Sequence, residues 1–99
     1  MATMDAKTLQ QFEVVVHDFE DKVEFDSHDF IFKYIEKFEE DYIRMLQPVK
    51  DGFQILDSWF GRALLDNQND LGIRKMDESS ISRNIKGNDT SCAKWEIIK

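Results

Sequence analysis

The residues from 26 to 46 constrain the fold more than any other stretch of this chain. The apolar side chains that recur there at steps of three and four residues are Ile31, Ile35, Phe38, Tyr42 and Leu46. This spacing places them on one face of an α-helix, while charged side chains fill the opposite face. Asp26 or Ser27 stands before the first turn, and both are residue types that cap a helix. The segment is therefore predicted to be an amphipathic helix around which the rest of the chain packs.

Two further helical patterns flank this segment. In residues 8–22 the apolar face consists of Leu9, Phe12, Val16 and Phe19. The valines at 14–16 also suit a strand because branched side chains lose rotamer freedom in a helix, but the helical spacing covers more residues. From Gly52 to about Asp66 the apolar face consists of Phe53, Leu56, Phe60 and Leu64. The short connection at 47–50, which contains Pro48, is typical of a helix-turn-helix arrangement.

The period changes from helical to alternating in the last third of the chain. A turn signal at 87–89 separates two alternating runs, whose same-face residues are Ile81, Arg83 and Ile85 before it and Ala93, Trp95 and Ile97 after it. We expect a hairpin within residues 71–98, with Ile81, Ile85, Trp95 and Ile97 facing the helices and with residues 76–80 irregular. Residues 23–25 also alternate and predict a short edge strand.

These elements predict one domain over residues 1–99, of the α+β class. A three-helix core at about 6–66 is followed by a β-hairpin region at about 71–98. Three helices and a terminal hairpin, with a tight turn between the second and third helix, have the winged-helix-like outline. Because many functions share one fold, this outline does not fix a function.

The charge is spread unevenly along the chain. The net charge is -7, with sixteen acidic and seven basic side chains in residues 1–70 and four acidic and six basic ones in residues 71–99. Extended negative potential repels phosphate backbones, so the first two-thirds is a poor nucleic-acid surface. No apolar run reaches the roughly 20 residues of a membrane span. Cys92 is the single cysteine, and the first residues form no apolar leader, so we expect a cytoplasmic protein.

No catalytic or metal-binding motif stands out. The tripeptide His-Asp-Phe occurs at 17–19 and at 28–30, but neighbouring residues on a helix point about 100° apart and share one metal ion poorly. Residues 66–72 only faintly resemble a calcium loop, because the glycine comes one position late. The hydroxyls at 79–91 have no histidine near them in sequence, and no glycine-rich phosphate loop is present. We expect no enzyme, no metal, no cofactor and no small-molecule substrate.

The sequence therefore favours a binding function. Twelve aromatic residues are many for one small core, and large aromatics left on a surface make the strongest protein contacts. The hypothesis is a non-catalytic module that binds another protein, or a second copy of itself, through an acidic and aromatic helical surface. The residues proposed for it are Phe32, Glu36, Glu39, Glu40, Asp41, Trp59 and Phe60.

Two alternatives remain open. The first is a winged-helix DNA-binding regulator that uses its hairpin, although the net charge disfavours nucleic acid. The residues it would use are Arg62, Arg83, Asn84, Lys86 and Lys94. The second is an acidic inhibitor that covers the basic surface of a nucleic-acid-handling protein, guided by charge complementarity.

Overall fold

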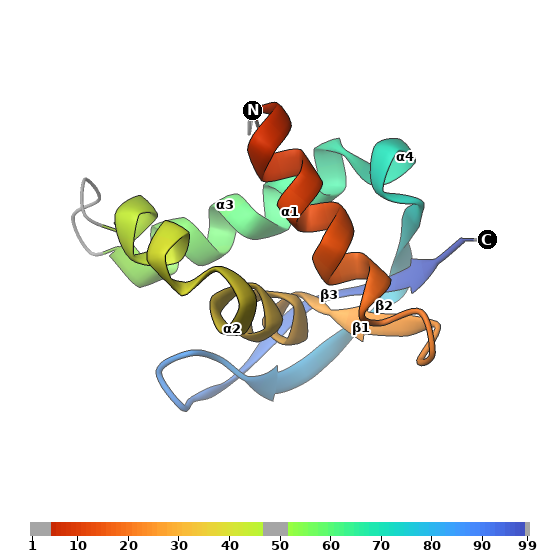
Figure 1. Cartoon of the computed structure of the whole chain (residues 1–99). Coiled ribbons are helices and arrows are strands. Elements are labelled where there is room, and N and C mark those ends of the chain that lie inside the picture. The colour runs from red at the N-terminus through yellow and green to blue at the C-terminus, as the bar shows by residue number, and fades with distance from the viewer. Residues whose placement is uncertain (1–4, 47–51, 99) are drawn as a thin grey trace.

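The computed structural model describes residues 5–46 and 52–98, without the side chains of 52–54. Within these ranges the protein is α+β, with helices on one side of a three-stranded antiparallel sheet (Figure 1). The elements are α1 (Ala6–His17), β1 (Glu24–Asp26), α2 (Ser27–Leu46), α3 (Gly52–Asp66), α4 (Gln68–Leu71), β2 (Ile73–Arg83) and β3 (Asp89–Ile97). The predicted connection at 47–50, with Pro48, lies outside the described residues.

The first helix is shorter than its pattern predicts. Asp5 caps α1, because its carboxylate accepts a hydrogen bond from the Thr8 amide at 2.8 Å, and the helix ends at His17 instead of continuing to residue 22. The valine run stays helical because Val15 and Val16 are buried against the other helices. Tertiary burial therefore overrides the local preference of valine for strands.

The central helix begins with a reciprocal cap and contains a break. Asp26 accepts a hydrogen bond from the Asp29 amide at 2.8 Å, and Asp29 accepts one from the Asp26 amide at 3.3 Å. Together they satisfy two of the amides that a helix start leaves free. Phe38 has φ -134° and ψ 47°, so α2 is two helical pieces with a kink between them. The spacing of apolar residues had indicated one continuous helix.

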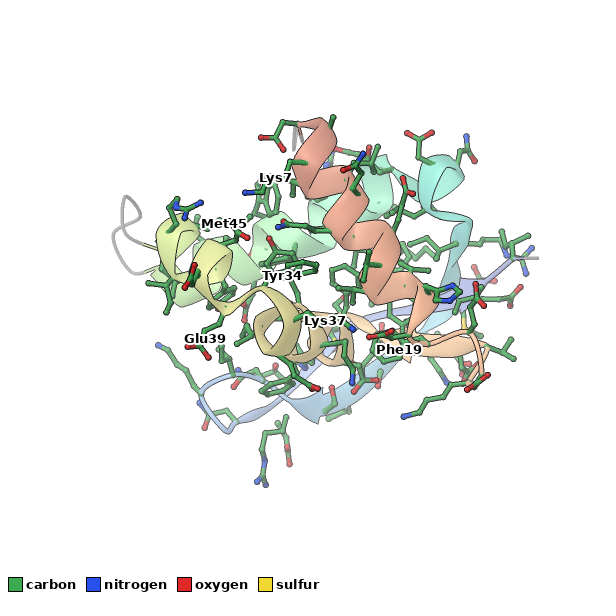
Figure 2. All side chains as sticks on the ribbon, in the orientation of Figure 1. Lys7, Phe19, Tyr34, Lys37, Glu39 and Met45 are labelled. Atoms are coloured by element: carbon green, nitrogen blue, oxygen red, sulfur yellow. The ribbon has the colours of Figure 1, made fainter. Side chains whose placement is uncertain are left out.

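The core of the helical half is a cluster of aromatic rings. Phe12 of α1 stacks on Phe60 of α3 with their ring centroids 5.5 Å apart, and Phe30 and Tyr34 of α2 lie 4.7 and 5.7 Å from the Phe12 ring. Figure 2 shows Tyr34 between the helices. Its hydroxyl donates to Gln11 at 2.7 Å, and burial, followed by the charge of Asp41, raises the pKa of Tyr34 to about 12. These rings account for much of the aromatic surplus.

The sheet joins distant parts of the chain in the order β1-β3-β2. Phe25 of β1 is paired with Trp95 of β3, and both side chains are buried under the helices. The Trp95 indole N–H donates to the Ser27 hydroxyl at 3.0 Å, which ties β3 to the start of α2. The predicted edge strand is present one residue later, at 24–26 instead of 23–25, and the predicted burial of Trp95 is confirmed.

The hairpin differs from its prediction in two places. Residues 76–80 belong to β2, where the register slips between Lys75 and Ser79 and forms a bulge. Ile81 is 77% exposed, so it does not join the face against the helices. Between α3 and the hairpin lies the short helix α4, which is capped at its C-terminus by Gly72 in the left-handed conformation (φ 66°). None of the described helices is long and apolar enough to cross a membrane.

Candidate functional site

The outward side of α2 is the main candidate surface, and it combines apolar and acidic side chains. Phe32 and Ile43 are 45% and 47% exposed, and Glu36, Glu39 and Glu40 are exposed between them. Figure 2 shows Glu39 on the side of α2 away from the aromatic core. We call these five residues the α2 outer face. Within each helical piece, steps of three and four residues bring side chains to one side: Phe32 and Glu36 before the kink, and Glu39, Glu40 and Ile43 after it.

The carboxylates of this face have few internal partners. Lys33 approaches Glu36 at 3.5 Å, whereas Glu39 and Glu40 form no hydrogen bond or ion pair with any residue in 5–46 or 52–98. An exposed i,i+3 pair contributes only about 0.5 kcal/mol. The negative charge of the α2 outer face therefore remains largely available to a partner.

Asp41 lies close to this face but serves the fold. Its carboxylate accepts a hydrogen bond from Gln11 at 2.8 Å and is approached by Lys7 at 3.4 Å and Arg44 at 3.0 Å. The hydrogen bond from Gln11 and the neighbouring cations lower the pKa of Asp41. This carboxylate is thus occupied in joining α1 to α2.

Trp59 and Phe60 of α3 do not form an exposed patch. Phe60 is fully buried, at 0% exposure, and Trp59 is half-buried with its ring 6.0 Å from Phe12 and 5.4 Å from Phe60. The expectation that Phe60 lies at a surface is therefore corrected. Counting aromatics cannot separate core from surface, because a helical stripe has the same spacing in either case.

The cations proposed for nucleic-acid binding are balanced by acids. Arg62 pairs with Asp66 at 3.5 Å and Arg83 with Asp89 at 3.8 Å, and Lys94 lies 3.0 Å from Glu24 and 3.4 Å from Glu78. The hydrogen bond to Glu24 raises the pKa of Lys94 and keeps the group protonated. These ion pairs reduce the positive potential that a phosphate backbone would meet.

The side chain of Asn84 is used to shape the hairpin turn. Its Oδ1 accepts hydrogen bonds from the Lys86 and Asn88 amides, each at 3.0 Å. Gly87 completes the turn at φ 86°, a conformation that glycine adopts without strain. Asn84 therefore has a structural task whichever molecule the hairpin meets.

A buried polar cluster joins α2 to the hairpin, and sequence reasoning missed it. The His28 Nδ1 lies 2.9 Å from the Ser82 hydroxyl, and Asp26 accepts a hydrogen bond from the Ser80 hydroxyl at 2.8 Å. Burial opposes ionisation of Asp26, but the Asp29 amide and the serine hydroxyls outweigh it and lower the pKa of this carboxyl. Because His28 and Ser82 are 54 positions apart, no local motif could have indicated the contact.

The thiol beside this cluster is half-buried. Cys92 Sγ lies 3.8 Å from the Ser82 hydroxyl, and burial raises the pKa of the thiol. The thiolate is the nucleophilic form of cysteine, so this shift favours the less reactive state. Among the described residues, no three histidine, cysteine or acidic side chains are grouped to hold a metal ion.

A cleft of about 290 Å³ opens between α3 and β3, with the start of α2 along one side. One Asp57 oxygen near it is buried without a hydrogen-bond partner among the described residues, and so is the Tyr42 hydroxyl. Burial raises the pKa of Asp57, whereas nearby His28 lowers it; burial and the Asp57 charge raise the pKa of Tyr42 to about 12. The cleft thus combines an apolar floor with one poorly satisfied carboxylate.

Comparison of the chain with protein-family models, with curated proteins and with solved structures gave no match.

Proposed function

We propose that this protein is a non-catalytic binding module that recognises another protein through the α2 outer face. Glu39 and Glu40, without internal partners in the described ranges, and the exposed Phe32 and Ile43 beside them support this proposal. A fitting partner presents basic side chains next to an apolar one. The carboxylates attract and orient such a partner, while burial of the two apolar side chains slows its dissociation.

A cross-linking experiment can find the partner. A photoreactive amino acid replaces Glu39, and in a control chain it replaces the exposed Glu13 of α1. The partner is then purified and titrated with this protein. We expect capture from position 39 and not from position 13, because only position 39 lies within the α2 outer face.

Charge reversal then tests the surface itself. The variant Glu36→Lys, Glu39→Lys, Glu40→Lys is compared with a control that carries the same charge change at Glu13, Asp21 and Asp70 on other elements. The first set should raise the Kd at least about tenfold and reduce the association rate, and the control should change both much less. Equal losses in the two sets would contradict a specific α2 surface.

The acidic-inhibitor hypothesis is a special case of this surface. A nucleic-acid-handling enzyme with a basic groove has the charge that Glu36, Glu39 and Glu40 complement. The same charge-reversal variant decides it, because inhibition of such an enzyme must weaken with the reversed charges and with added salt.

A winged-helix DNA-binding regulator is the second candidate. The position of β1 between α1 and α2, its pairing with β3, and the β2–β3 hairpin after the helices support a winged-helix-like fold. The ion pairs of Arg62, Arg83 and Lys94 count against a strong phosphate footprint. Binding to random duplex DNA should therefore be weak even at about 50 mM salt, and tight binding there would favour this candidate over the protein-binding one.

A further inference from the structure

The outer edge of β2 offers backbone groups for a further strand. β2 stands at one end of the sheet, and α4 covers only its first residues, where the Gln68 side chain accepts from the Lys75 amide at 2.8 Å. The bulge then separates this covered part from residues 79–83, which pair with β3 in regular register. Edge strands are commonly protected by charges or bulges, but the stretch 79–82 contains three serines and Ile81 and no charge.

The hairpin turn fixes which backbone groups point outward. The Asn84 amide donates to the Asn88 carbonyl at 2.8 Å, so these two residues form a hydrogen-bonded pair. Such pairs recur at every second position of an antiparallel ladder, which assigns Ser80 and Ser82 to bonds with β3. The N–H and C=O groups of Ser79, Ile81 and Arg83 therefore point away from β3.

The outward backbone groups of one β2 edge can pair with the same groups of a second copy. If two β2 edges meet antiparallel about a two-fold axis at Ile81, Ile81 faces its counterpart, and Ser79 of each chain faces Arg83 of the other. All the outward donors and acceptors of the three residues then find partners. Ile81, the most exposed of the large apolar side chains in the described ranges, is covered by the Ile81 of the second copy.

The charges along the edge fit the same arrangement. Asp77 and Glu78 stand before the uncharged stretch, and Arg83 and Lys86 stand after it. An antiparallel pairing brings the acidic end of one strand beside the basic end of the other. A parallel pairing would place like charges together, which destabilises strand pairs.

We propose that the β2 edge is a docking site for a second copy of this chain, with residues 79–83 of the two copies paired antiparallel into one six-stranded sheet. The contact is isologous and closes at two copies, because each chain has one β2 edge. Because the contact consists of five residues of one strand edge, we expect it to bury less than the roughly 1,200–2,000 Å² of a standard interface and to form only at high protein concentration. This surface is separate from the α2 outer face, so the two proposals are tested independently.

Sedimentation equilibrium up to about 1 mM protein measures the association. The wild type should dimerise reversibly. Ile81→Lys should weaken dimerisation at least about fivefold, because like charges then meet at the axis. Val14→Lys, which replaces another exposed apolar residue with the same charge, should not weaken it. A wild type that stays monomeric over the whole range, or equal effects of the two variants, would overturn the proposal.

A charge swap tests the direction of the strands. Asp77→Arg and Arg83→Glu should each weaken the dimer, and the double variant should recover at least half of the loss. Thermal melts at low protein concentration check that each variant is folded. A weaker dimer can then be attributed to the strand edge and not to unfolding. Failure of the double variant to recover, with both single variants weakened and folded, would rule out the antiparallel register.

Amide hydrogen exchange tests the register residue by residue. As protein concentration rises, protection should increase at Ser79, Ile81 and Arg83, while Ser80 and Ser82 are already protected by β3. Protection that rises uniformly along β2, or that rises on α2 instead, would contradict edge pairing. Loss of the effect in Ile81→Pro, which removes an outward N–H and leaves the bonds to β3 intact, would support it.

Discussion

The helical half and the far end of the hairpin are held together by different forces. The helices close over stacked rings, with Phe12 and Phe60 fully buried and in contact with several other aromatics. Beyond the bulge, β2 and β3 are joined to α2 by hydroxyl, imidazole and carboxylate groups, among them Ser82, His28 and Asp26. The hydrophobic effect has no preferred direction, whereas polar contacts depend on geometry and protonation. Stability of the helical half should therefore depend little on pH, and the contacts of the hairpin with Asp26 should depend on it more.

The largest expected effect on stability comes from disrupting the aromatic core of the helical half. Phe60→Ala removes a ring of α3 that contacts rings of α1 and α2, and should lower the free energy of unfolding by roughly 3–5 kcal/mol. Urea denaturation followed by tryptophan fluorescence measures the change. Unfolding should remain a single transition, because the sheet has no separate aromatic core. A loss below about 1 kcal/mol would show that the rings do not dominate the core.

A smaller effect on stability should follow from removing the polar contacts between the hairpin and the start of α2. Asp26→Ala removes the cap of α2 and the acceptor of the Ser80 hydroxyl, and should cost about 1–2 kcal/mol at neutral pH. The pKa of Asp26 is lowered in the folded state, so its stabilisation is present above the unfolded value of about 3.9 and is lost as the pH falls. Denaturation between neutral and acid pH should show a larger loss in the wild type than in the variant, in which Asp5 and Asp41 still lose their stabilising contribution.

Asp57 should have the opposite dependence on pH. Burial raises the pKa of this carboxyl in the folded state, so its favourable contribution is present at low pH and is lost as the pH rises through the folded pKa. Asp57→Asn should therefore increase stability at neutral pH by less than about 1 kcal/mol. Thermal melts at neutral and at acid pH measure it. A variant less stable than the wild type at neutral pH would show that an interaction of the carboxylate offsets the free-energy cost of burying it.

The smallest effect should come from the exposed centre of β2. Ile81→Ala removes a side chain that is 77% exposed and should change the stability of the monomer by less than about 0.5 kcal/mol. Denaturation at low protein concentration measures this value, so that any dimer is absent. A loss as large as that of Asp26→Ala would mean that the hairpin depends on Ile81 for its own folding.

Sequence reasoning found the elements that are encoded locally. Periodicity located α2 and the hairpin, and the edge strand, to within one residue, and the burial of Trp95 followed from alternation alone. It failed where distant residues decide. The kink at Phe38 and the bulge have no signal in the spacing of apolar residues, and the contact of His28 with Ser82 joins segments that are far apart in the chain.

The candidate site was predictable only in part. Glu36, Glu39 and Glu40 are exposed as their helical positions indicate, because a charged stripe opposite an apolar one faces water. Residue type alone places Phe60 and Asp41 at the surface. In the structure Phe60 lies in the core, and Asp41 joins α1 to α2 through its hydrogen bond with Gln11. The outward backbone of β2 has no side-chain signature and becomes visible only with the register.

The late position of Trp95 has a consequence for how the chain folds during its synthesis. Its indole binds Ser27, which is made 68 residues earlier, and the first strand has no partner in the sheet until β3 emerges. Until β3 has been made, the side of α2 that packs on the sheet is exposed. The nascent chain is then prone to aggregation. Rapid synthesis of the last segment, or shielding by a chaperone, should therefore raise the yield of native molecules.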